Sequence, residues 1–198
     1  MTNYFWGTPD ITVKFCEKKY EQVYWIAEYD NTYSALPYVL LGLFLYNTKI
    51  KKIGIATVVL GFSTAIMHGT LRYYGQWLDE CSLLYISFET IRLIKKNIAF
   101  YYFLPIIISY FYFKDYYIVF LSTFTFLQFV IIYLVINKKK RHIDKILIYA
   151  YIITFLTAGI FWILDQKMCE PENYISYHAA WHILSCLGMF YGYLSFII

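Results

Sequence analysis

Seven mainly apolar stretches alternate with short polar connections along the chain. A helix that crosses a bilayer needs about 20 mainly apolar residues, within a range of roughly 17 to 25. The candidate spans are residues 33–46, 53–71, 78–91, 98–113, 116–136, 146–164 and 178–197. The first, third and fourth are short as delimited, so we expect them to extend into their flanks. The pattern predicts an all-α integral membrane bundle of seven transmembrane helices.

Two prolines, Pro37 and Pro105, fall inside the first and fourth predicted spans. A proline within a helix lacks an N–H donor and therefore frees a backbone carbonyl. Membrane helices tolerate this because neighbouring groups can satisfy the freed carbonyl. We therefore expect both prolines to lie inside spanning helices.

The composition is typical of a protein that lies in a lipid bilayer, because 60% of the residues are hydrophobic and only 15% are charged. A soluble domain is typically about half apolar and about a quarter charged. The spans leave no stretch for a separate soluble domain, so we expect one seven-transmembrane domain over residues 1–198. Residues 1–30 carry five acids, which excludes a cleavable signal peptide with its basic start and early apolar core. The first apolar span is then a permanent anchor.

Basic residues concentrate in the first, third and fifth predicted loops. These loops hold 11 of the 17 Lys and Arg residues but only two acids, Glu89 and Asp144. The basic residues are Lys49, Lys51, Lys52, Arg92, Lys95, Lys96, Lys138, Lys139, Lys140, Arg141 and Lys145. The positive-inside rule places these loops in the cytosol. The N-terminal segment 1–30 is then lumenal or extracellular and the C-terminus cytosolic. We expect a multi-pass protein of the endoplasmic reticulum, Golgi or plasma membrane.

Three of the four histidines fall at one predicted depth in the membrane. His68 lies near the end of the second span, and His178 and His182 open the seventh on one helical face. Three imidazoles with an open fourth position are a common catalytic zinc site, although imidazole also suits copper, iron and nickel. The alternative is that each histidine is a hydrogen-bonded packing residue. His142, within a basic loop, is interpreted as a solvated side chain.

Two further polar residues fall on the same predicted side of the membrane. Asp79 begins the third span, where it could cap the helix or be a first-turn acid that the helix dipole favours. It could also orient an attacking water or accept its proton, and zinc would lower the pKa of that water. Thr64 lies one turn before His68 and could donate to a developing oxyanion. A threonine bonded to its own helix carbonyl is an equal alternative.

These motifs together resemble the alkaline ceramidase family over nearly the whole chain. The matching parts are Trp6-Gly7, Phe15-Cys16-Glu17, Tyr20, Ile26-Ala27-Glu28-Tyr29, Asn31-Thr32, residues 64–71, Leu78-Asp79-Glu80 and residues 178–184. The resemblance implies that His68, His178 and His182 bind zinc and that Asp79 assists the attacking water. It also implies that the Thr64 hydroxyl, in place of a family serine, supports the site. Ser63 is a neighbouring alternative, one residue off that face. Ala180 replaces a family tryptophan, which could alter the substrate cavity.

The resemblance also implies a second, calcium site near the N-terminus, from which this chain departs. Phe15, Glu17 and Glu28 remain as candidate ligands, but Lys14 stands where an aspartate is usual and Lys19 where an asparagine is usual. Lysine offers donors and no lone pair, whereas calcium takes six to eight oxygens. We therefore expect calcium to be lost, with the Lys14 or Lys19 ammonium compensating the two glutamates. The alternative is ordinary solvated surface charge.

The four cysteines fit the same topology. Cys16 precedes the first span and Cys169 lies in the sixth loop, both lumenal in the predicted orientation. An oxidising compartment would permit a disulfide between them, and the resemblance implies this pairing. Cys81 and Cys186 are interpreted as buried free cysteines, which behave as small apolar residues.

The resemblance implies hydrolysis of the amide bond of ceramide-type lipids, giving a sphingoid base and a free fatty acid. The expected partners are a ceramide-class lipid and the bilayer, with no nucleic acid and no protein partner. One alternative is an adiponectin-receptor-like protein or another lipid hydrolase, but such receptors have a larger cytosolic N-terminal region. The other is a transporter, which would place ionisable residues in the middle of several spans. Here they gather at one membrane edge.

Overall fold

The computed structural model describes residues 4–138, 141–169 and 175–198. Within these residues every regular element is helical, which confirms the predicted all-α class. The elements are α1 (Tyr29–Tyr33), α2 (Leu36–Tyr46), α3 (Lys51–Thr70), α4 (Tyr73–Ile94), the 3₁₀ helix η1 (Phe100–Phe103), α5 (Leu104–Tyr112), α6 (Tyr117–Lys138), α7 (His142–Lys167) and α8 (Tyr177–Ile197). Each of the seven predicted apolar stretches corresponds to helix in this order.

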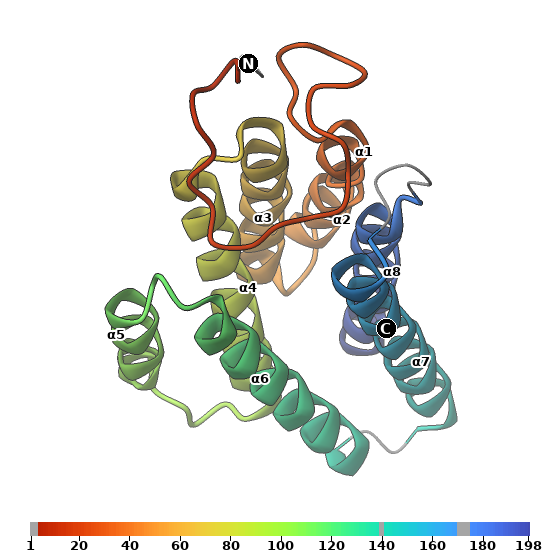
Figure 1. The fold of residues 1–198 in the computed structure, drawn as a ribbon. Coiled ribbons are helices and arrows are strands. Elements are labelled where there is room, and N and C mark those ends of the chain that lie inside the picture. The colour runs from red at the N-terminus through yellow and green to blue at the C-terminus, as the bar shows by residue number, and fades with distance from the viewer. Residues whose placement is uncertain (1–3, 139–140, 170–174) are drawn as a thin grey trace.

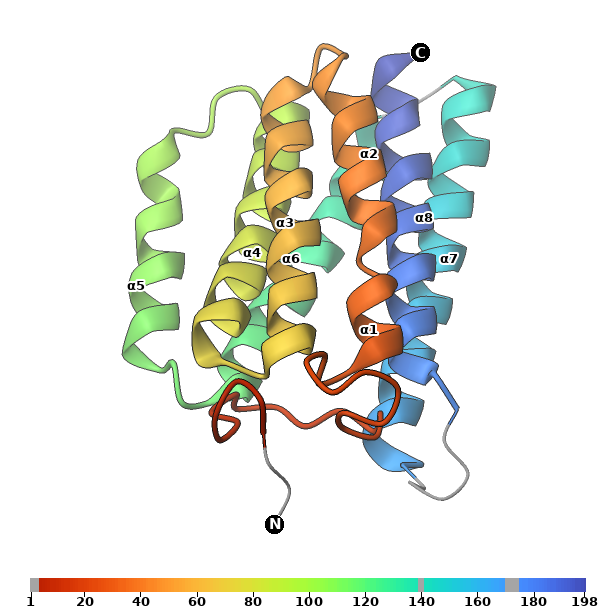
Figure 2. The same cartoon turned by 90° about the horizontal axis from the view of Figure 1, so that it is seen from above.

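The long helices run side by side as a bundle (Figure 1, Figure 2). α3 packs between α2 and α4, α7 packs against α8, and α5 stands at the outer edge. Within the part of the chain that the structure describes, four helices, α3, α6, α7 and α8, are long and apolar enough to cross a membrane. α4 has 22 residues but carries three acids and an arginine. Several apolar helices of this length are typical of a multi-pass membrane protein.

The first predicted span, residues 33–46, corresponds almost entirely to α2, and a short separate helix, α1, precedes it. α1 ends at Tyr33, and α2 begins at Leu36 with Pro37 in its first turn. Pro105 likewise lies in the first turn of α5, directly after η1. Proline suits this position because the first N–H groups of a helix have no intrahelical acceptor. Both prolines therefore lie in helices, as expected, but each stands in the first turn, where it removes no intrahelical hydrogen bond.

The two ends of the bundle differ in what they carry. The α2–α3 and α4–η1 connections lie at the same end as the C-terminus (Figure 2). Arg141, before α7, donates to the Ile198 carbonyl at 3.3 Å, so the start of α7 lies there too. Lys139 and Lys140 fall outside the described residues. The basic connections therefore share one end, and the α3–α4 turn and the N-terminal segment occupy the other.

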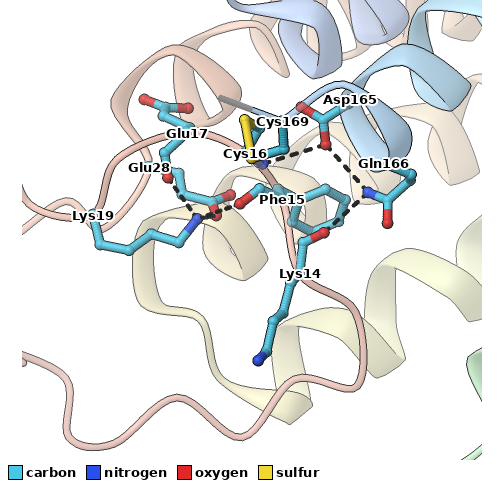
Figure 3. The surroundings of a disulfide bond; sticks show 9 residues. All are labelled: Lys14, Phe15, Cys16, Glu17, Lys19, Glu28, Asp165, Gln166 and Cys169. Carbon is cyan, nitrogen blue, oxygen red and sulfur yellow. Dashed lines mark hydrogen bonds and ion pairs between the residues drawn. A yellow bond between two sulfur atoms is a disulfide. The ribbon is translucent and has the colours of Figure 1, made fainter. Parts of the chain in front are cut away.

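The N-terminal segment, residues 4–28, lies across this second end of the bundle without regular structure (Figure 2). A disulfide joins Cys16 to Cys169 beyond α7, with 5.2 Å between the Cα atoms (Figure 3). Gln166 donates to the Lys14 carbonyl at 3.0 Å. At α4, the Thr12 N–H donates to the Gln76 side chain at 2.7 Å. The segment is thus fixed to helices that are far apart in sequence. The other two cysteines, Cys81 and Cys186, are free, the first partly buried and the second buried.

Candidate metal centre

The three histidines singled out by the sequence meet inside the bundle. His68 lies in the last turn of α3, while His178 and His182 lie in the first two turns of α8. All three are buried, and one ligand atom from each lies within 4.8 Å of the other two. Their ring centroids are 4.5 to 5.0 Å apart. This spacing is compact enough for three imidazoles to share one ion.

Hydrogen bonds fix the orientation of two of these imidazoles. His68 Nδ1 lies 2.5 Å from Glu28 Oε2, and a carboxylate there accepts the Nδ1 proton. His182 Nδ1 lies 2.7 Å from Ser34 Oγ. The Ser34 hydroxyl donates to the Asn31 carbonyl, so its oxygen accepts the proton from His182. Both rings then carry the proton on Nδ1, which leaves the Nε2 lone pair available.

The remaining imidazole nitrogens support a cation at this point. His68 Nε2 and His178 Nδ1 are buried and have no hydrogen-bond partner among the residues that the structure describes. Buried polar atoms are almost always paired, so each orphan needs an explanation. A metal ion that accepts these lone pairs would explain both nitrogens, and imidazole nitrogens suit zinc. The residues present therefore fit the metal that the sequence predicts.

A carboxylate and a hydroxyl lie beside the histidines. The Thr64 hydroxyl donates to Asp79 and also lies 2.8 Å from the Leu60 carbonyl of its own helix. Both side chains line the same cavity as His178. The close approach of α3 and α4 depends on Gly75, where a Cβ would lie 2.7 Å from the Met67 Cα. Asp79 is thus held toward α3.

Two details at these positions differ from the sequence interpretation. α4 begins at Tyr73, so Asp79 lies in the second turn and is not the helix cap. The Thr64 hydroxyl contacts both its own helix carbonyl and Asp79, which combines alternatives treated as separate. Ser63 donates to the Leu60 carbonyl at 2.9 Å, as a serine satisfied within its own helix does.

A cavity of about 610 Å³ extends from the histidines into the bundle. His178, His182, Asp79 and Thr64 line one end of it, and its walls are otherwise mostly apolar. Residues of α6 from Tyr117 to Val135 border it, which is about 27 Å of helix. A cavity of this size and lining is typical of sites for largely apolar ligands.

The structure gives Phe15 a contact that the sequence did not predict. Its ring lies against His178 and His68, with centroid distances of 4.1 and 4.7 Å. Ser34 and Tyr38 were not singled out either. Tyr38 lines the cavity and its hydroxyl lies 2.6 Å from Ser185 Oγ. Ser34 ends a mostly polar run, residues 28–34, just before an apolar helix, and this run was the sequence feature that could have indicated its role.

The candidate calcium ligands are engaged with other groups. Lys19 Nζ donates to the carbonyls of Phe15 and Glu17 and to the Glu28 carboxylate (Figure 3). The Glu17 carboxylate accepts the N–H groups of Asp30 and Asn31 at 2.7 and 2.9 Å. These residues therefore do not fit calcium.

The pKa values of the two glutamates of this segment shift in opposite directions. Burial raises the pKa of Glu17 to about 7, although its two backbone donors oppose that shift. Burial would also raise the pKa of Glu28, but His68 and Lys19 together outweigh it and hold that pKa below its usual value. Glu28 is thus a buried carboxylate kept ionised by the two cationic or donor groups on either side of it.

Comparisons with known proteins agree on one family. The family model described as ceramidase matches residues 7–198. The putative alkaline ceramidase dcd3B of Dictyostelium discoideum is 26% identical over 251 residues, covering 98% of this chain and 88% of the relative. Alkaline ceramidase 1 of Mus musculus is 25% identical and covers 91% of this chain and 77% of the relative. Alkaline ceramidase YPC1 of Saccharomyces cerevisiae is 31% identical over 88 residues, covering 40% of this chain and 28% of the relative.

Proposed function

Because the chain belongs to the ceramidase family, whose members hydrolyse the ceramide amide bond, we propose a zinc-dependent reaction that releases a sphingoid base and a free fatty acid. His68, His178 and His182 would hold the zinc. The observation that carries this proposal is the meeting of three buried imidazoles beside Asp79 at the end of an apolar cavity. We propose that residues 1–198 form one domain for this reaction.

Zinc in such a site supplies Lewis acidity toward a carbonyl oxygen and lowers the pKa of water toward neutrality. The residues around the histidines would orient them toward the ion and shield them from water. Glu28 and Ser34 fix the tautomer and ring orientation of His68 and His182, as outer partners of metal-binding histidines do. Phe15 covers the faces of His68 and His178. Its ring excludes water from that side of the imidazoles.

Asp79 is placed to move the proton that amide hydrolysis requires. The water oxygen bonds to the carbonyl carbon, and Asp79 accepts one water proton. The carbon–nitrogen bond then breaks, and Asp79 delivers the same proton to the leaving amine. Thr64 holds the carboxylate in position through its hydrogen bond. An oxyanion role for Thr64 would require it to exchange that bond, so we assign it to positioning Asp79.

The cavity supports access for a lipid from the side of the bundle. Several of its lining residues on α6 and α7 are also exposed on the outer surface, as in Phe129 at 61% and Ile160 at 56%. We propose that the seven helices span the bilayer with the histidine end lumenal or extracellular and the basic end cytosolic. A ceramide tail could then enter between α6 and α7 without leaving the membrane.

Filling the cavity wall should hinder long-chain substrates selectively. A Cβ at Gly159 of α7 would meet nothing within 4 Å, and the residue lines the cavity. Gly159→Phe is expected to lower kcat/KM for a long-chain ceramide roughly tenfold or more, and a short-chain ceramide less. The control is Ile153→Phe, which adds a ring on the exposed face of the same helix outside the cavity lining. Equal losses by both variants, or for both substrates, would reject this access route.

Metal removal provides the direct test of the proposed reaction. Purified protein in detergent should release fatty acid from a fluorescent ceramide and should lose this activity on dialysis against a zinc chelator. Stoichiometric zinc should restore it, because the imidazole lone pairs are preformed. Full turnover by protein shown to be free of metal would refute the zinc-dependent mechanism and leave the family assignment standing.

A further inference from the structure

The ammonium group of Lys19 lies in a cage of oxygens beside the metal centre. Its Nζ lies 2.8 Å from the Phe15 carbonyl and 2.6 Å from the Glu17 carbonyl, and it forms an ion pair with Glu28 (Figure 3). An ammonium has three donors and no lone pair, so these three acceptors use it fully. The cage therefore has an occupant supplied by the chain itself.

The neighbouring lysines do not share this arrangement. Lys18 pairs with Glu21 at 3.2 Å, and both side chains are largely exposed. The Lys14 side chain points away from the cage, and the Lys14 carbonyl accepts a hydrogen bond from Gln166 (Figure 3). Of the two lysines predicted to compensate the glutamates, Lys19 is the one that does so. It reaches Glu28 by its side chain and Glu17 by that residue's backbone.

The cage is connected to the histidines by two short routes. Glu28 contacts Lys19 through Oε1 and His68 through Oε2, and the exposed fraction of Glu28 is 0%. Phe15 gives its carbonyl to Lys19 and packs its ring against His68 and His178. The Lys19 ammonium thus helps to position both Glu28, which orients His68, and Phe15, which covers His68 and His178.

We propose that Lys19 is a built-in cation that replaces calcium in this chain and positions the metal centre through Glu28 and Phe15. The zinc-affinity readout of this inference rests on the proposed function, but its Tm and calcium-binding readouts do not. Calcium would need six to eight oxygens where Nζ now lies, and the ammonium excludes it both by charge and by volume. The chain is therefore independent of calcium at this site.

Removing the ammonium leaves a buried carboxylate with one partner fewer. Lys19→Met, which keeps the apolar stem, is expected to lower Tm by roughly 5–10 °C. It should also weaken zinc binding, by no more than the roughly 10–100-fold loss typical when a direct partner of a metal-binding histidine is changed, because Lys19 acts on His68 through Glu28. Lys18→Met is the matched control on the same loop and should leave both quantities unchanged, because its ion pair is exposed.

Substituting an oxygen ligand at the same position should create a calcium site. Lys19→Asp places a carboxylate beside the carbonyls of Phe15 and Glu17 and the Glu28 carboxylate. In calcium-free buffer it should be at least as unstable as Lys19→Met. Added CaCl₂ at a fixed zinc concentration should restore the Tm of Lys19→Asp, and one calcium ion should bind per chain. Lys19→Met should not respond.

The experiment is a CaCl₂ titration of wild type and the three variants, followed by Tm and by ⁴⁵Ca binding. Wild type is expected to show no calcium response, and only Lys19→Asp should gain one. If wild type itself bound calcium, or if calcium raised its Tm, the proposal would be overturned whatever the variants did. A Lys19→Met protein with wild-type Tm and zinc affinity would also overturn it. These readouts need no ceramide turnover, so an inactive wild type would count against the proposed function alone.

Discussion

Replacing His178 by alanine is expected to release the bound metal and to slow ceramide hydrolysis about a thousandfold or more. The metal's stabilisation of charge in the transition state amounts to several kcal/mol, and this magnitude corresponds to such a factor. Two imidazoles would remain, which is fewer than the three protein ligands typical of catalytic zinc. Metal content per chain and turnover of a fluorescent ceramide measure the two effects together.

His142→Ala is the matched control for this variant. His142 begins α7 at the opposite, basic end of the bundle and is exposed. It should keep full metal content and turnover. A His178→Ala protein that folds, retains one metal per chain and turns over ceramide like His142→Ala would contradict the role given to the histidines.

Asp79→Asn should separate chemistry from metal binding. The amide keeps the size of the side chain and can still contact Thr64, but it cannot accept a proton. Loss of a general acid–base group typically lowers kcat about 10²–10⁴-fold. Metal content and the KM for ceramide should change little, because the three imidazoles do not depend on this carboxylate for their orientation.

Asp115→Asn tests whether any such loss is specific to position 79. Asp115 lies between α5 and α6 and is exposed, so the same acid-to-amide change there should leave kcat unaffected. If Asp79→Asn retained more than about a tenth of wild-type kcat, general acid–base catalysis at this position would be excluded. If it lost metal instead, Asp79 would belong to the metal-holding set.

Hydropathy was sufficient to predict the helices and their order, because apolar length is a local property. It did not predict the short helix α1 before the first apolar stretch, or the break between α1 and α2, where Ser34 hydrogen-bonds to His182 of α8. The third span was expected to extend into its flanks, and α4 does begin earlier, at Tyr73, although hydropathy did not predict that residue as its start. Helix boundaries of this kind are decided by neighbouring elements, which a single sequence does not reveal.

The meeting of the histidines followed from the alternation of spans, which places the end of one helix beside the start of another. The groups that orient them did not follow. Glu28 was considered only as a remaining ligand of a lost calcium site, and its contact with His68 depends on how residues 4–28 fold across the bundle. The choice of Lys19 over Lys14 and the packing of the Phe15 ring depend on the same fold. Contacts between irregular segments and distant helices have no periodic signal.

In the proposed metal centre, imidazoles from α3 and α8 surround a single ion. The most direct measurement is the zinc K-edge X-ray absorption spectrum of the purified wild-type protein, together with its zinc content. We expect one zinc per chain with three nitrogen scatterers at about 2.0–2.1 Å. A spectrum with sulfur scatterers or fewer than three imidazoles, or protein that is active with no zinc bound, would contradict this arrangement.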